Sequence, residues 1–177
     1  MDRRKKTGEE RRQFILDWLK KTTEPLTGQV IAEKTNVSRQ IVVQDISLLK
    51  ARNEPVMATS QGYVYLTEQR STLPFKKIIA CRHVPKDTER ELLMMVDHGV
   101  TVRDVSVEHP IYGELTATLM IKNRRDVIDF IKRMDSTNAA YLSDLTEGVH
   151  LHTIEADTEE QLSSLCQELE QAGFLLK

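Results

Sequence analysis

The chain of 177 residues is 40% hydrophobic and 29% charged, with a formal net charge of −2, which is typical of a soluble protein with one medium domain or two small ones. No apolar run approaches the ~20 residues of a membrane span, and the start MDRRKKTGEERR lacks the apolar segment of a secretory signal. We therefore expect a cytoplasmic protein that makes no membrane contact.

Charge is distributed unevenly along the chain. Residues 1–70 hold 13 Lys and Arg against 9 Asp and Glu, a net charge of +4, and the remaining residues hold 12 against 18, a net charge of −6. A basic front and an acidic back indicate two regions with different partners. The two cysteines, Cys81 and Cys166, form no disulfide framework, which fits a reducing compartment.

The first seventy residues have the pattern of a helix-turn-helix. A first helix is predicted over residues 9–21, a second begins after a cap at Thr27, and a third begins after a cap at Ser38. Asn36 lies in the turn between the second and third helices and tolerates left-handed geometry. The predicted apolar faces comprise Phe14, Ile15, Trp18 and Leu19 in the first helix, Val30, Ile31 and Ala32 in the second, and Ile41, Val42, Ile46 and Leu49 in the third.

Two short β-prone runs follow the third helix, over residues 56–59 and 63–66, with Gly62 in the turn between them. They predict a hairpin, which in this position is the wing of a winged helix-turn-helix domain. The segment resembles the winged domain of the biotin-repressor type, whose pattern is matched here by Ala32, Val37-Ser38-Arg39, Ile41 and Asp45-Ile46.

In such motifs the N-terminal part of the second motif helix enters the major groove of double-stranded DNA, where amide and guanidinium groups contact base edges. The residues we expect there are Ser38, Arg39, Gln40, Val43 and Gln44. Basic side chains outside this set suit the phosphates, which position the domain without reading the base sequence. They are Arg3, Arg4, Lys5, Lys6, Lys50 and Arg52.

The polar stretch Thr67 to Pro74 predicts a connector, which divides the chain into a winged domain over residues 1–70 and a second domain over residues 75–177. The second domain alternates strands and helices. Strands are predicted over 77–84, 101–109, 114–121 and 148–157, helices over 87–97, 123–134 and 157–173, and an edge strand over 174–176. Asp87 and Asn123 are predicted to cap their helices. The fold class is therefore mixed α/β, with the winged domain followed by an α+β domain on a mostly antiparallel sheet.

Four side chains of the second domain are candidates for metal binding. His150 and His152 project from the same face of one predicted strand, because strand side chains alternate between faces. His83 ends another strand, and Glu91 lies in the first turns of the helix that follows it. Three imidazoles and a carboxylate suit a divalent transition metal such as Zn²⁺, Ni²⁺, Fe²⁺ or Mn²⁺ better than Ca²⁺ or Mg²⁺.

Three segments of the second domain, RHVPKDTERELLMMVDHG, VEHPIYGEL and EGVHLHTIEA, resemble the signature segments of the three-histidine domain. That domain occurs behind this type of winged helix in the nicotinate-responsive repressor family, often called NiaR. The resemblance covers both domains in order. It implies a repressor of NAD salvage and transport genes with nicotinic acid as co-repressor and a divalent metal at His83, Glu91, His150 and His152. We expect a homodimer that binds palindromic DNA.

The effector site is less defined by the sequence. His109 and Tyr112 lie in the turn His-Pro-Ile-Tyr-Gly and are predicted to line the effector pocket, although His109 could instead make a structural hydrogen bond at the strand end. Arg82, Arg103 or a helix N-terminus is available for a carboxylate. Cys81 lies on the same strand face as His83, either as another ligand or as a small buried group. Two other functions stay open, a metal-dependent hydrolase and a regulator that senses the metal directly.

Overall fold

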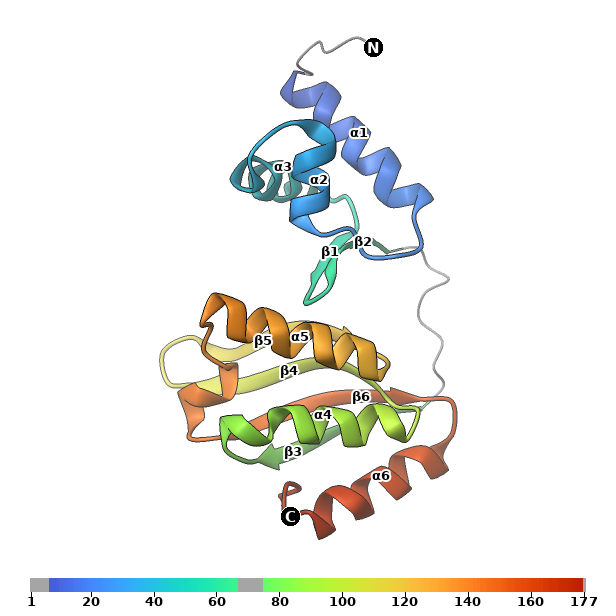
Figure 1. The fold of residues 1–177 in the computed structure, drawn as a ribbon, viewed down its shortest axis with the longest axis vertical. Coiled ribbons are helices and arrows are strands. Elements are labelled where there is room, and N and C mark those ends of the chain that lie inside the picture. The colour runs from blue at the N-terminus through green and yellow to red at the C-terminus, as the bar shows by residue number, and fades with distance from the viewer. Residues whose placement is uncertain (1–6, 67–74, 177) are drawn as a thin grey trace. The chain divides into compact units, whose positions relative to one another are not determined.

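The computed structural model describes residues 7–66 and 75–176, and the chain divides into two compact units, residues 1–71 and 72–177 (Figure 1). Each unit is described by itself. The basic arm Arg3 to Lys6 and the predicted connector Thr67 to Pro74 lie outside the described residues. Within the described ranges, no helix combines the length and the apolar character that crossing a membrane requires.

The first unit consists of three helices and a hairpin. The helices are α1 (Gly8–Lys21), α2 (Gly28–Thr35) and α3 (Arg39–Ala51), and the antiparallel strands are β1 (Val56–Thr59) and β2 (Gly62–Tyr65). Thr27 and Ser38 cap α2 and α3 as predicted, and Asn36 between them adopts the left-handed conformation with φ of 54°. The unit is therefore the expected helix-turn-helix followed by a hairpin.

The core of the first unit is narrower than the predicted apolar faces, and Phe14 and Trp18 of α1 are only half-buried. Val30 is 43% exposed, and Ile41 is only half-buried. Asp45 lies in the buried face of α3 instead, where it accepts hydrogen bonds from Arg11 of α1 at 2.5 and 3.1 Å and from Arg12 at 3.3 Å. This ion-pair cluster joins α1 to α3.

The second unit is a four-stranded antiparallel sheet with helices packed against one face. The strand order is β3 (Phe75–Arg82), β6 (Val149–Ala156), β4 (Thr101–His109) and β5 (Gly113–Ile121). The helices are α4 (Thr88–Asp97), α5 (Arg124–Thr137) and α6 (Glu159–Gln171), with short 3-10 helices η2 (Pro85–Asp87) and η3 (Leu142–Thr146). The mostly antiparallel α+β architecture is confirmed.

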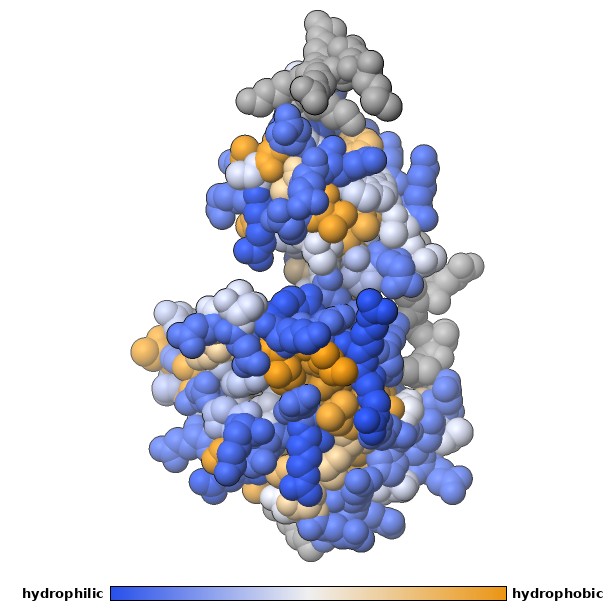
Figure 2. All heavy atoms as spheres, in the orientation of Figure 1, coloured by the Kyte–Doolittle hydropathy of each residue, from blue (hydrophilic) through white to orange (hydrophobic). Residues whose placement is uncertain are grey.

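One apolar core joins the helices to the sheet. Leu92 of α4, Val127 of α5 and Leu165 of α6 pack against inward side chains of the strands, among them Ile79 and Ile154. In Figure 1, α4 and α5 lie across this face. Figure 2 shows hydrophobic side chains on the surface between α5 and α4, surrounded by hydrophilic ones. The helices therefore cover the face of the sheet on which the histidines of β6 lie.

Two details of the second unit differ from the helix cap and the edge strand that the sequence predicts. Asp87 precedes α4, but its side chain makes no capping hydrogen bond, because η2 continues into α4 with helical geometry. The predicted strand over 174–176 is reduced to a single bridge, between Leu175 and Cys81 at the edge of β3. Asn123, by contrast, caps α5 as predicted by accepting from the Asp126 backbone N–H at 3.0 Å.

Candidate metal centre and nucleic-acid interface

The pairing of β3 with β6 brings the histidines together. Cys81 stands opposite His150, and Ile79 stands opposite His152. Because side chains two residues apart share a face, His150 and His152 both point into the core, and each is 3% exposed. His83 follows β3 directly and is also buried. Strand alternation thus places three imidazoles on the side that the helices cover.

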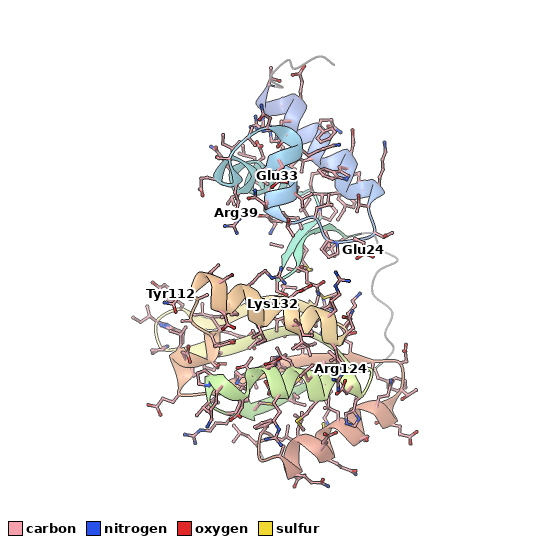
Figure 3. The ribbon with its side chains drawn as sticks, viewed as in Figure 1. Glu24, Glu33, Arg39, Tyr112, Arg124 and Lys132 are labelled. Atoms are coloured by element: carbon pink, nitrogen blue, oxygen red, sulfur yellow. The ribbon has the colours of Figure 1, made fainter. Side chains whose placement is uncertain are left out.

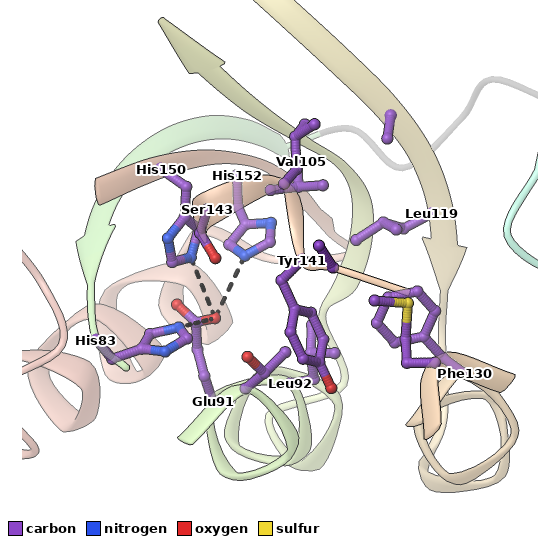
Figure 4. Close-up of a pocket in the computed structure, with 15 residues that line it drawn as sticks. His83, Glu91, Leu92, Val105, Leu119, Phe130, Tyr141, Ser143, His150 and His152 are labelled. Carbon is purple, nitrogen blue, oxygen red and sulfur yellow. Dashed lines mark hydrogen bonds and ion pairs between the residues drawn. The ribbon is translucent and has the colours of Figure 1, made fainter. Parts of the chain in front are cut away.

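One oxygen of Glu91 is the meeting point of the three imidazoles. The distance from its Oε2 atom to Nε2 is 2.7 Å for His83, 3.3 Å for His150 and 3.4 Å for His152. Figure 4 shows the three rings converging on this carboxylate from α4. The four residues predicted to hold a metal therefore form one buried cluster, in which Glu91 is 0% exposed.

The other nitrogen of each ring is occupied by the main chain. His83 Nδ1 lies 2.9 Å from the Val84 carbonyl, His150 Nδ1 lies 2.8 Å from the Gly148 carbonyl, and His152 Nδ1 lies 2.8 Å from the Asp104 carbonyl. A carbonyl can only accept, so each Nδ1 carries a proton and donates it. In a neutral imidazole the Nε2 lone pair then points toward the cluster, as in histidines that bind metal ions.

The cluster shifts the pKa values of its members in opposite directions. Burial lowers the pKa of His83, but the hydrogen bond and the charge of Glu91 outweigh burial, and the net pKa is raised. The pKa of His152 is raised by the same balance. Burial raises the pKa of Glu91, but the charge of His152 and the hydrogen bonds from the imidazoles lower it well below the usual range. The carboxylate is therefore ionised, and without a metal it is stabilised by rings that carry a second proton, on Nε2, and donate it to Glu91.

A second atom of the same carboxylate has no such support. Glu91 Oε1 is buried and finds no hydrogen-bond partner among the described residues. A buried carboxylate oxygen normally has a partner, because desolvation without one costs free energy. An unpaired oxygen beside three imidazole nitrogens is chemically suited to a divalent transition metal. The donor set thus fits the predicted metal.

Cys81 lies at the edge of the same cluster. Its Sγ atom, a carboxylate oxygen of Glu91 and a ring nitrogen of His150 are all within 4.8 Å of one another. Burial, followed by the charge of Glu91, raises the pKa of the thiol. Cys81 also belongs to the apolar core, so the contact with Glu91 is compatible with either predicted role.

A cavity of about 230 Å³ extends from the histidines along the sheet. Its floor follows one row across the strands, from His152 through Val105 to Ala117, which are successive partners in the β6, β4 and β5 ladders. Phe130 of α5 and Tyr141 before η3 contribute aromatic rings with centroids 6.5 Å apart (Figure 4). None of the described residues that line the cavity is Lys or Arg.

The residues predicted for the effector do not line this cavity. His109 and Tyr112 lie at the turn between β4 and β5, where Tyr112 is 73% exposed at the outer end of the hairpin (Figure 3). His109 Nδ1 accepts from the backbone N–H groups of Ile111 and Tyr112, both at 3.2 Å. These bonds correspond to the structural alternative for His109, because the ring organises the turn at the end of β4.

The arginines considered for a carboxylate lie elsewhere too. Arg82 is exposed, because it alternates with Cys81 and points to the opposite face of the sheet. Arg103 forms an ion pair with Glu155 at 2.7 Å. The residues that do line the cavity, Phe130, Met134, Tyr141 and Ser143, were not predicted. One signal in the sequence was available. Tyr141 and Leu142 are an aromatic and an apolar residue in a predicted connector, and because connectors are usually polar, they could have indicated this wall of the cavity.

The candidate DNA-reading residues share one exposed side of α3. Ser38, Arg39, Gln40 and Gln44 are exposed, and Val43 is half-buried. Figure 3 shows Arg39 at the start of α3. Lys50 is exposed in the last turn of the same helix. The buried residues Val42, Ile46 and Leu49 occupy the opposite side, so the polar start of α3 is free to contact a groove. Arg52 instead pairs with Glu9, at 2.6 and 3.0 Å.

Comparison with known proteins identifies both units. A 3H domain model matches residues 76–177, and an HTH domain model matches residues 11–64. The chain is 55% identical over 171 residues to a Bacillus subtilis protein named "Transcription repressor NadR", covering 96% of this chain and 95% of that protein. It is 37% identical over 169 residues to the "Probable transcription repressor NiaR" of Thermotoga maritima, covering 96% and 95%.

Proposed function

This chain belongs to the family of NadR and NiaR transcription repressors, which join an HTH domain to a 3H domain, and we propose that it binds a divalent metal and uses nicotinic acid as co-repressor. The genes under its control are proposed to serve NAD salvage and nicotinate transport. The chain is a regulator and not an enzyme, because its relatives are named as repressors and it carries an HTH domain.

The main support for the metal proposal is that the Nε2 atoms of three histidines converge on Glu91. The Nδ1 atom of each of these histidines donates a hydrogen bond to a backbone carbonyl. Such outer hydrogen bonds fix the tautomer of a ligand histidine and raise its basicity. His83, Glu91, His150 and His152 would hold the ion. Bound there, it would supply a positive charge and an acceptor for ligand lone pairs at the end of the cavity.

The cavity supports an aromatic acid as the effector. Nicotinic acid combines a flat ring with a carboxylate and a pyridine nitrogen. The ring suits the apolar walls and the rings of Phe130 and Tyr141. Because the described lining contains no Lys or Arg, recognition of the carboxylate or the nitrogen would rely on the histidine end of the cavity. Neither Arg82 nor Arg103, the two arginines that the sequence suggested for the carboxylate, lines the cavity.

Repression further requires that effector binding reach the DNA-binding unit. We expect two copies of the chain to bind the two halves of a palindromic operator, since an HTH dimer reads half-sites about one helical turn apart. The dimer can adopt an arrangement that fits the operator and one that does not. The effector can favour the first only to the extent that it binds it more tightly than the second. Binding between α5, η3 and the sheet would supply that difference if those elements pack differently with the cavity filled.

Native mass spectrometry and calorimetry of the full-length protein test the proposal. We expect one divalent ion and one nicotinic acid per chain, a dimeric mass, and tighter binding to operator DNA when nicotinic acid is present. His152→Ala should lose the metal and the effector response while keeping weak basal DNA binding, because the core of the first unit is separate. Full metal content and a normal response in His152→Ala, His83→Ala and Glu91→Ala would refute the site.

A direct metal sensor is the remaining alternative. The apolar cavity beside the cluster favours an organic effector, because a metal sensor needs no such volume. The two functions differ in one measurement. If DNA affinity rises with the metal alone and nicotinic acid adds nothing, the chain senses the metal itself.

A further inference from the structure

We propose that Cys81 is an additional ligand in the metal centre, bound through its thiolate sulfur. This inference rests on the proposed metal site and adds to it a donor of different chemistry. Its structural basis is the β3–β6 ladder, in which Cys81 stands directly opposite His150. Directly paired residues in an antiparallel sheet have Cβ atoms about 4.5 to 5.5 Å apart, close enough for their side chains to share one ion.

The distances support a shared ion. The Sγ atom of Cys81, a carboxylate oxygen of Glu91 and a ring nitrogen of His150 lie within 4.8 Å of one another. Metal–sulfur and metal–nitrogen bonds of about 2.3 and 2.0 to 2.1 Å, at the roughly 90° to 120° angles of a five-coordinate site, put neighbouring donor atoms roughly 3.1 to 3.8 Å apart. Small side-chain adjustments would therefore bring these three donors to bonding distance of one ion.

A second observation points to a ligand at the same place. Glu91 is 0% exposed, and its Oε1 atom has no hydrogen-bond partner in the part of the chain that the structure describes. Cys81 is also 0% exposed. The thiol of Cys81 and the unpaired carboxylate oxygen are both shielded from water, and with the nearby ring nitrogen of His150 they form a mixed sulfur, nitrogen and oxygen donor set.

A thiolate would change which metal the site prefers. Sulfur is a soft ligand and favours Zn²⁺ over Mn²⁺, whereas imidazole and carboxylate alone would accept both. When the metal–sulfur bond forms, the thiol gives its proton to solvent, and no oxidant or reductant is needed. The site would then select metals by softness and release one more proton on binding than a site without Cys81.

Cobalt substitution of the full-length protein tests this ligand directly. The protein is stripped with a chelator and reloaded with Co²⁺, which commonly replaces Zn²⁺ and whose absorption reports its ligands. We expect visible d–d bands together with a near-ultraviolet thiolate-to-cobalt charge-transfer band. Cys81→Ala should lose the charge-transfer band, and its Zn²⁺ affinity should fall by at least about ten-fold, since even outer-shell partners are worth roughly 10- to 100-fold.

Cys166→Ala is the matched control, because Cys166 is half-buried on α6 and should keep the charge-transfer band. If Cys81→Ala does not fold, the wild-type and Cys166→Ala spectra still decide the question, because Cys81 is the remaining cysteine in the sequence. Visible bands without a charge-transfer band would overturn the Cys81 proposal and leave the histidine site intact. No cobalt binding at all would overturn the proposed metal site together with this inference.

Discussion

The carbonyl oxygen of Gly148 accepts a hydrogen bond from the backbone N–H of His83 at 3.4 Å, and a Cβ atom on Gly148 would lie 2.2 Å from the His83 carbonyl oxygen. The same Gly148 carbonyl accepts from His150 Nδ1. One glycine with φ of +89° therefore sets the main-chain approach of two of the four proposed ligands. A side chain at this position would push them apart.

We predict that Gly148→Ala weakens metal binding and destabilises the fold by more than the ~1–3 kcal/mol of a strained backbone conformation. Calorimetric metal titration and thermal unfolding measure the two effects. Gly113→Ala is the control, since Gly113 has φ of +72° but open space around its Cβ position. It should show the strain alone and bind metal normally. Equal metal affinity in the two variants would mean that Gly148 does not position His83.

The architecture was predictable because it depends on local patterns. Capping residues such as Ser38, alternation along β6 and the turn at Asn36 each determine their own segment. Burial on α3 was less predictable, because Asp45 is buried only through its pairing with Arg11 and Arg12, which lie more than thirty residues earlier. The spacing of residues along the chain does not reveal such a long-range ion pair. The prediction for the buried face of α3 therefore contained only apolar residues, Ile41 among them.

The histidine cluster could be predicted from local patterns in the sequence, whereas the cavity could not. His150 and His152 share a face by strand alternation, and His83 and Glu91 are separated by one short turn of chain. Predicting the cavity requires knowledge of where α5 lies on the sheet, because that decides which of its apolar side chains pack tightly and which line a space. In the structure Phe130 lines the cavity and Ile128 is 42% exposed. Helical spacing places Phe130 on one apolar stripe with Val127, Ile131 and Met134, but it does not show that part of this stripe lines a cavity.

The cavity predicts a preference among ligands. Nicotinic acid should bind the metal-loaded protein much more tightly than nicotinamide, because the amide lacks the negative charge that a cation at the histidine end would attract. Titration calorimetry with both compounds measures the difference. Equal affinity would remove the carboxylate from the proposed recognition.

The aromatic wall of the cavity predicts a second effect on ligand affinity. Phe130→Leu keeps an apolar side chain but removes the ring, which should lower nicotinic acid affinity about 2- to 10-fold, the equivalent of roughly 0.5 to 1.5 kcal/mol for an aromatic contact. Ile128→Ala, on the exposed side of the same helix, is the matched control in the same titration. If both variants bind the ligand as well as the wild type does, the ring does not contact it.

The start of α3 predicts two kinds of DNA contact. Arg39→Ala and Gln40→Ala should each weaken operator binding by about 1 to 3 kcal/mol if they make bidentate base contacts. Lys50→Ala should weaken binding to operator and random duplexes alike and reduce the salt slope by about 1. Fluorescence anisotropy at several salt concentrations separates the two kinds. Equal losses on both duplexes for Arg39→Ala would place base reading elsewhere.

The histidine cluster predicts the pH dependence of stability in metal-free protein. The raised pKa values of His83 and His152 contribute stability that is fully present below pH about 6.5 and is lost as the pH rises through the folded-state values. The lowered pKa of Glu91 contributes stability that is present above pH about 4.5 and is lost as the pH falls below it. Thermal unfolding of chelator-treated protein should therefore show a maximum between these limits.

Glu91→Gln tests the origin of that maximum. Removing the carboxylate charge removes the interaction that raises the histidine pKa values, so the loss of stability above pH about 6.5 should become smaller. Addition of metal to the wild type should reverse the alkaline trend, because metal binding competes with protons for the imidazoles. An unchanged alkaline slope in Glu91→Gln would assign the effect to other groups.

The partners of the three Nδ1 atoms are carbonyl groups, which every amino acid carries. Replacing the side chain of Val84 leaves the acceptor of His83 in place. Asp104 is different, because its side chain accepts from the backbone N–H of Thr153 at 3.1 Å at the irregularity in the ladder, next to the carbonyl that accepts from His152. The orientation of the three histidines therefore depends more on the course of the main chain than on the side chains around them. We therefore expect substitutions in the walls of the cavity, such as at Phe130, to change ligand preference without reorienting the three imidazoles.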